Sequence, residues 1–118
     1  MNTMVKTLMA QGWDKYYNAY TVEEACEELG LDIEETKHEN ELIERCNYGK
    51  VVGVLMLKEE VARQLDNVDG IDIVDVLDNG TVGVAWGFGS CNNNGCYFNS
   101  VTLEQLEQYV NGEVDCIM

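Results

Sequence analysis

Hydrophobic residues recur at helical spacing through the first twenty positions of the chain. The residues that follow this spacing are Met4, Val5, Leu8, Met9, Trp13, Tyr16, Tyr17 and Tyr20. Steps of three and four residues place such side chains on one face of a helix, so the pattern predicts an amphipathic helix over about residues 2–19. Gly12 is a weak point inside this helix, because glycine costs about 1 kcal/mol relative to alanine there.

A second helix is predicted over residues 22–29. Thr21 and Glu24 have the spacing of a capping box, in which each side chain binds the backbone N–H of the other residue. Gly30 stands where a glycine commonly ends a helix. The segment therefore carries both a start and a stop signal.

A third helix is predicted over residues 33–48, with Asp32 as its capping residue. Its amphipathic pattern is imperfect, because Glu35 and Glu39 project towards the side of Leu42. A start of this helix nearer His38 is therefore the alternative interpretation.

The pattern then changes from helical spacing to short apolar runs. The run VVGVLML after Lys50 predicts a buried strand over 50–57. Asn79-Gly80 is a strong hairpin signal between two further runs. The remaining strands are predicted at 71–77, 81–88 and 96–101.

Two short helices complete the predicted fold. One covers residues 59–65, and the other covers 102–110, where Thr102 and Gln105 form a second capping box. Helices followed by a small, mostly antiparallel sheet are typical of the α+β class. At 118 residues, the chain is expected to form a single compact domain over residues 1–118.

Acidic residues dominate the charge of the chain. Its 22 Asp and Glu outnumber seven Lys and Arg, the net charge at pH 7 is −15, and no Lys or Arg follows Arg63. DNA, RNA and anionic membranes would repel such a chain, because their binding proteins need cations to neutralise phosphate charge. Self-repulsion does not favour folding, so the imbalance indicates a basic partner or a need for solubility.

Two groups of carboxylates are the candidate partner-binding residues. Residues 23–44 hold ten acids and one base, Lys37, and an Asp ladder of period three follows later in the chain. A solvated face and an interaction surface both explain such groups. The candidates are Glu23, Glu24, Glu27, Glu28, Glu34, Glu35, Glu41, Asp66, Asp69, Asp72, Asp75 and Asp78.

The Asp ladder does not follow the period of a strand. On the predicted strand 71–77, Asp72 and Asp75 must point to opposite faces, so one of them faces a rim, an edge or a partner. A calcium loop is the other interpretation of these acids. Residues 66–72, however, lack the alternating ligand order of such a loop, and no Glu stands at its twelfth position.

Residues 21–33 resemble the first helix and turn of a helix-turn-helix motif, with a small inward residue, a turn glycine and the cap Asp32. The resemblance implies a recognition helix after Asp32. That helix carries acids where base contacts need Arg, Lys, Gln or Asn. We therefore expect an ordinary helix pair, or a helical scaffold that offers carboxylates to a basic groove, without direct DNA binding. The acids are Glu34, Glu35, Glu39, Glu41 and Glu44.

Five cysteines, an odd number, favour a reducing compartment, so we expect a cytoplasmic protein. Cys91 and Cys96 have C-x₄-C spacing across an Asn-rich hairpin tip. Reduced thiols, a disulfide or redox pair, and a weak zinc site that needs two further ligands all stay open. No cofactor is expected.

We find no catalytic motif in the sequence. His38 is the one histidine, which leaves few candidates for general acid–base chemistry. No phosphate-binding loop or dinucleotide fingerprint occurs. We therefore do not expect an enzyme.

A small, very acidic, single-domain chain without catalytic groups resembles in kind the phage-encoded counter-defence proteins, such as anti-CRISPR and antirestriction proteins. That resemblance implies an inhibitor in the host-cell cytoplasm, bound to the basic nucleic-acid-binding surface of another protein or complex. We expect a monomer or a homodimer. One alternative is an acidic interaction or regulatory module that binds through an apolar patch such as Trp13, Tyr16 and Tyr20. A second alternative is a small metal or redox protein that uses Cys91 and Cys96.

Overall fold

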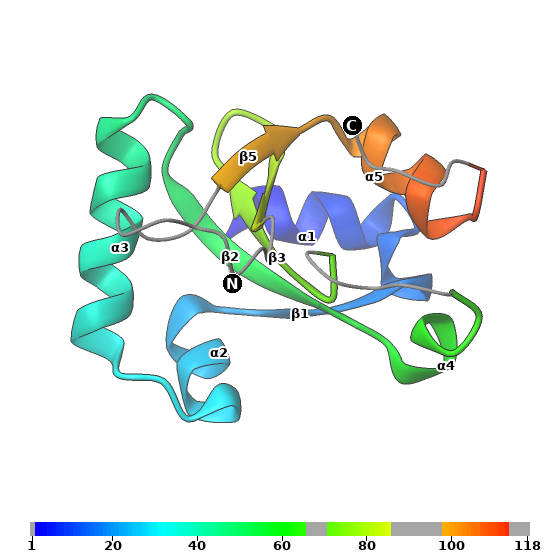
Figure 1. The fold of residues 1–118 in the computed structure, drawn as a ribbon, viewed down its shortest axis with the longest axis horizontal. Helices are drawn as coiled ribbons and strands as arrows, with labels where there is room; N and C mark the ends of the chain where they lie inside the picture. Colours follow the sequence, from blue (N-terminus) through cyan, green and yellow to red (C-terminus); the bar gives the residue numbers. More distant parts are fainter. Residues whose placement is uncertain (1, 66–70, 86–97, 114–118) are drawn as a thin grey trace.

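The computed structural model of the chain describes residues 2–65, 71–85 and 98–113. Helices surround a five-stranded sheet whose order, β1-β2-β3-β4-β5, is the order of the strands along the chain (Figure 1). Every neighbouring pair of strands is antiparallel. The α+β prediction is therefore confirmed, and the sheet is a meander.

The described elements begin and end as follows. The helices are α1 Thr3–Ala10, α2 Val22–Leu29, α3 Ile33–Arg45, α4 Glu59–Ala62 and α5 Leu103–Val110, with a 3₁₀ turn, η1, at Trp13–Lys15. The strands are β1 Tyr17–Tyr20, β2 Val51–Leu57, β3 Ile73–Leu77, β4 Val82–Ala85 and β5 Phe98–Val101.

The predicted first helix over 2–19 is wrong beyond Ala10. Gly12 adopts a left-handed backbone with φ 104°, and the chain continues through η1 into β1, an edge strand paired with β2. The helical spacing misled because Trp13 and Tyr17, four residues apart, both enter the core although a helix does not join them.

The other boundaries differ less from the predicted ones. The second helix matches over 22–29, and the third starts at Ile33 and ends at Arg45 rather than at residue 48. The predicted strand 71–77 starts at Ile73, and the predicted helix 59–65 ends at Ala62. Residues 86–88 and 96–97 of two predicted strands lie outside the described residues.

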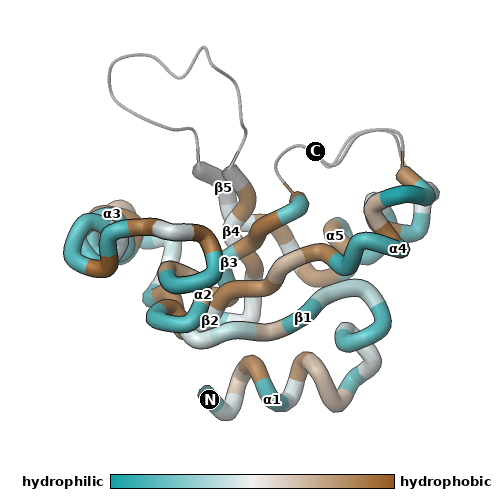
Figure 2. The backbone as a smooth tube through the Cα atoms, turned by 90° about the horizontal axis from the view of Figure 1, so that it is seen from below, coloured by the Kyte–Doolittle hydropathy of each residue, from teal (hydrophilic) through white to brown (hydrophobic). Residues whose placement is uncertain are grey.

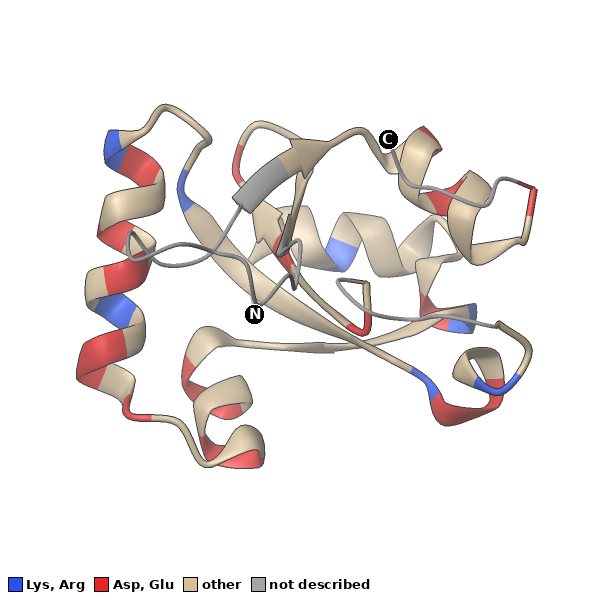
Figure 3. Cartoon of the chain, in the orientation of Figure 1, with Lys and Arg blue, Asp and Glu red and all other residues tan. Residues whose placement is uncertain are grey.

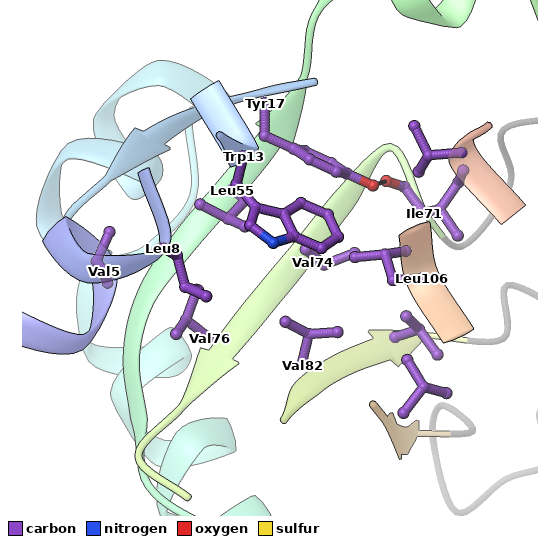
Figure 4. Close-up of a cluster of buried hydrophobic side chains, with 13 residues drawn as sticks. Val5, Leu8, Trp13, Tyr17, Leu55, Ile71, Val74, Val76, Val82 and Leu106 are labelled. Carbon is purple, nitrogen blue, oxygen red and sulfur yellow. Dashed lines mark hydrogen bonds between the residues drawn. The ribbon is translucent and has the colours of Figure 1, made fainter. Parts of the chain in front are cut away.

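The main core lies between the sheet and two helices. Val5 and Leu8 of α1 and Leu106 of α5 meet Val76 and Val82 of the sheet (Figure 4). Such close packing of branched side chains supplies most of the stabilisation of a small domain. This core leaves α2 and α3 as the more peripheral helices.

The packing of α2 and α3 is much lighter. Figure 2 shows α1 on one side of β1 and β2 and α3 on the other. In α2, Ala25 and Cys26 are buried, whereas α3 buries no residue fully. Thirteen residues of α3 therefore present most of their side chains to solvent.

Candidate functional site

Residues 21–46, which we call the α2–α3 unit, hold the largest group of predicted partner-binding residues. Thr21 starts the unit as predicted: its hydroxyl accepts from the N–H of Glu24 at 3.0 Å, and the Glu24 carboxylate accepts from the N–H of Thr21 at 2.9 Å. Two otherwise unpaired N–H groups are thus satisfied, which stabilises the helix start by about 1 kcal/mol.

Asp32 starts α3 by accepting hydrogen bonds from the N–H groups of Glu34 at 2.9 Å and Glu35 at 3.4 Å. A half-buried stripe then runs along the helix at steps of three and four residues. Its members are Ile33, Thr36, Asn40 and Ile43. Because this stripe faces the domain, Leu42 lies on the exposed side of the helix, and the pattern is amphipathic from Ile33 onward.

All ten carboxylates of residues 23–44 are exposed. Figure 3 shows acidic positions recurring along both α2 and α3. Among the described residues, the ion pair that involves this group joins Arg45 to Glu41 at 3.9 Å. An exposed pair at that distance contributes little. Seven of the predicted residues are thus exposed within the α2–α3 unit: Glu23, Glu24, Glu27, Glu28, Glu34, Glu35 and Glu41.

An open groove of about 560 Å³ runs between α3, the start of α2 and the start of β2. Two cations line it, Lys37 and Lys50, together with Glu23, Glu41 and Glu44. Both signs of charge occur in the groove, whereas the outer surface of the unit is mostly negative. The sequence did not reveal this groove, because it depends on how α3 packs beside β2.

The Asp ladder does not form a single face. Asp66 and Asp69 lie outside the described residues. The Asp78 carboxylate accepts from the backbone N–H of Lys50 at 3.0 Å, so it holds the β2–β3 end together. Asp72 lies near Tyr17, where burial and then the Asp72 charge raise the pKa of the Tyr17 hydroxyl.

Among the described members of the ladder, Asp75 is the one whose carboxyl interacts with a residue of the α2–α3 unit. It is half-buried in a row that crosses all five strands and consists of Tyr20, Val54, Asp75, Gly83 and Ser100. Burial, and then the Glu39 carboxylate of α3, raise the pKa of Asp75 to about 6. Asp72 precedes β3 and its charge acts on Tyr17, whereas Asp75 lies within β3 and its pKa responds to Glu39.

The cysteines and the histidine are the residues that metal, redox or acid–base chemistry would need. Cys91 and Cys96 lie outside the described residues, and Cys26 is buried while Cys46 is exposed. The described part of the chain contains no group of three or more metal-ligating side chains. His38 is exposed on α3.

The aromatic patch expected for an interaction module is mostly part of the core. Trp13 is 6% exposed and stacks edge-on against Tyr16, with ring centroids 5.7 Å apart. Tyr16 and Tyr20 are half-buried. These rings therefore do not form a free apolar face.

Sequence reasoning missed three exposed leucines of the α2–α3 unit. Leu29, Leu31 and Leu42 are exposed among the carboxylates, and Figure 2 shows hydrophobic segments within the hydrophilic helices α2 and α3. The conflict between Leu42 and its glutamate neighbours was the signal that this leucine faces solvent.

Within the described ranges, no helix is both long and apolar enough to cross a membrane. Comparisons with protein-family models, with curated proteins and with solved structures found no match to this chain. Inferences about its function therefore depend on the charge, exposure and geometry of its own residues, and the α2–α3 unit is the strongest candidate surface.

Proposed function

We propose that this chain is a small acidic inhibitor, without catalytic activity, that binds the basic nucleic-acid-binding surface of another protein in the cytoplasm. The observation that carries this proposal is the exposure of all ten carboxylates of residues 23–44, of which Glu41 alone has an ion-pair partner in the described part of the chain. Lys and Arg side chains of a partner would neutralise these charges.

The charge density of the unit supports this choice of partner. Ten carboxylates against Lys37 and Arg45 leave the unit with a net charge of −8. Its longer helix, α3, has 13 residues and spans about 20 Å. Duplex DNA carries about 12 charges over that length. The whole unit carries about two-thirds of that number, spread over both helices, and α3 alone carries −3, about a quarter of it.

A second candidate function is an acidic interaction or regulatory module with a partner that does not bind nucleic acid. The exposed leucines favour a protein contact over a purely solubilising role, because solubility does not require hydrophobic side chains among the acids. The two candidates differ in the chemistry of the partner's surface.

Affinity capture from a prokaryotic lysate, followed by a competition assay, tests the proposed function. We expect the captured protein to be basic and to bind DNA or RNA, and we expect the chain to displace that nucleic acid. Neutral or acidic partners would contradict the proposal. So would a complex whose affinity does not change between low and high salt.

A further inference from the structure

The described part of the chain exposes four large hydrophobic side chains, and three of them belong to the α2–α3 unit. Leu31 is 52% exposed, Leu42 is 43% exposed and Leu29 is 39% exposed, while Ile73 of β3 is 36% exposed. Single exposed leucines are ordinary. Three of them in one acidic helix pair, whose helices fully bury only Ala25 and Cys26, are not.

The turn between α2 and α3 holds two of these leucines in a fixed position. Gly30 adopts φ 70°, and the N–H of Leu31 donates to the carbonyl of Cys26 at 2.8 Å. In helix ends of this kind, the side chain at the position of Leu31 commonly packs back onto the helix. Here more than half of it stays exposed, so a hydrogen-bonded turn presents it to solvent.

Carboxylates flank Leu29 and Leu31 on both sides along the chain. Glu27 and Glu28 precede Leu29, and Asp32 follows Leu31; all three are exposed, and none has an ion-pair partner among the described residues. A second copy of the chain would bring like charges together, and an anionic membrane would be repelled. A protein segment that combines apolar side chains with Lys and Arg would instead complement both the leucines and the carboxylates.

We infer that Leu29 and Leu31 dock a basic amphipathic segment of the partner protein, with Glu27, Glu28 and Asp32 around its cations. This inference rests on the proposed function and adds the chemistry of the partner's contact. A surface that acted through charge alone would bind a cationic segment equally well whether or not it carried large apolar side chains. An apolar anchor ringed by charge is the usual arrangement of a protein–protein contact centre.

Two synthetic helical peptides of equal length and charge test this inference with the full chain. One combines Lys with Leu on an amphipathic face, and the other combines Lys with Ala. We expect the Leu-containing peptide to bind about tenfold more tightly, because each buried leucine removes apolar surface from water. The double substitution Leu29→Ser and Leu31→Ser should abolish that preference.

Ile73→Ser is the matched control, since it removes an exposed hydrophobic side chain outside the unit. It should leave the preference unchanged. Equal binding of both peptides, weakened by Glu27→Gln with Glu28→Gln, would overturn the docking inference and leave the proposed function standing. A preference that survives both leucine substitutions would also overturn it. Failure of both peptides to bind at low salt would count against the inference and the proposed function together.

Discussion

A Cβ atom placed on Gly53 would lie 2.6 Å from Cγ2 of Val5. Helix α1 therefore approaches β2 at a distance that a side chain at position 53 would prevent. The glycine in the apolar run of β2 is thus explained by packing, since its backbone needs no positive φ. The close approach brings Val5, which is fully buried, onto the sheet.

Gly53→Ala should lower the free energy of unfolding by about 1–3 kcal/mol, because the added methyl group overpacks the contact with Val5. Denaturant unfolding measures the loss directly. Val5→Ala removes the obstructing methyl groups, so the double variant should lose less than the sum of the two single losses. Strictly additive losses would show that the two residues do not meet in this way.

The Tyr17 hydroxyl donates to the backbone carbonyl of Ile71 at 2.8 Å inside the core. Tyr17→Phe should therefore cost about 1–3 kcal/mol of unfolding free energy, because a buried carbonyl loses its donor. Tyr16→Phe is a matched control, since the Tyr16 hydroxyl donates to Asn111 at 2.7 Å in an exposed position. We expect its cost to be smaller, because water replaces the lost partner. Equal losses of unfolding free energy in the two variants would contradict the burial of the Tyr17 hydrogen bond.

Asp75 should give the chain a pH-dependent stability. Its folded-state pKa of about 6 lies above the ordinary value of 3.8, so the folded state binds more protons between these two values. Stability should therefore fall as the pH rises from about 4 to 6, with the full cost present above pH 6. That pKa difference corresponds to at most about 3 kcal/mol.

Asp75→Asn should accordingly stabilise the chain at pH 7 and have little effect at pH 4. Thermal or denaturant unfolding at both pH values measures the difference. Glu104→Gln removes an exposed carboxylate elsewhere and serves as the control for the general relief of negative charge. If both variants change stability equally at pH 7, the burial of Asp75 is not the cause.

Like-charge repulsion within α2 leads to a different expectation. Glu23 and Glu27, and likewise Glu24 and Glu28, are four residues apart on a helix. Glu27→Gln with Glu28→Gln should stabilise the free chain by about 0.2–0.5 kcal/mol per pair, and the gain should shrink in high salt. A loss of stability that persists in high salt would mean that these carboxylates make contacts important for the fold.

Local signals in the sequence predicted much of the fold. Both capping boxes form, at Thr21 with Glu24 and at Thr102 with Gln105. The Asn79-Gly80 turn joins β3 and β4, with Gly80 at φ 90°. Strand β1 was missed because its side chains continue the helical spacing of α1, while pairing with β2 is a long-range contact that spacing cannot encode.

The candidate surface was predictable in part. The acidity of residues 23–44 is visible in the sequence, and their exposure follows from the light packing of α3. The sequence predicts that Asp72 and Asp75 face opposite ways, but it does not predict that Asp78 bonds to the backbone of Lys50 or that Asp75 is half-buried. These differences arise from strand register, which depends on pairing partners that the sequence does not name.

The affinity of the captured partner as a function of salt tests the proposed function most directly. The chain, an α2 variant with Glu27→Gln and Glu28→Gln, and an α5 variant with Glu104→Gln and Glu107→Gln would be titrated at several salt concentrations. We expect weaker binding and a shallower salt dependence for the α2 variant, with the α5 variant unchanged. Equal affinities and equal salt dependence for all three proteins would contradict a role of the α2–α3 unit in binding.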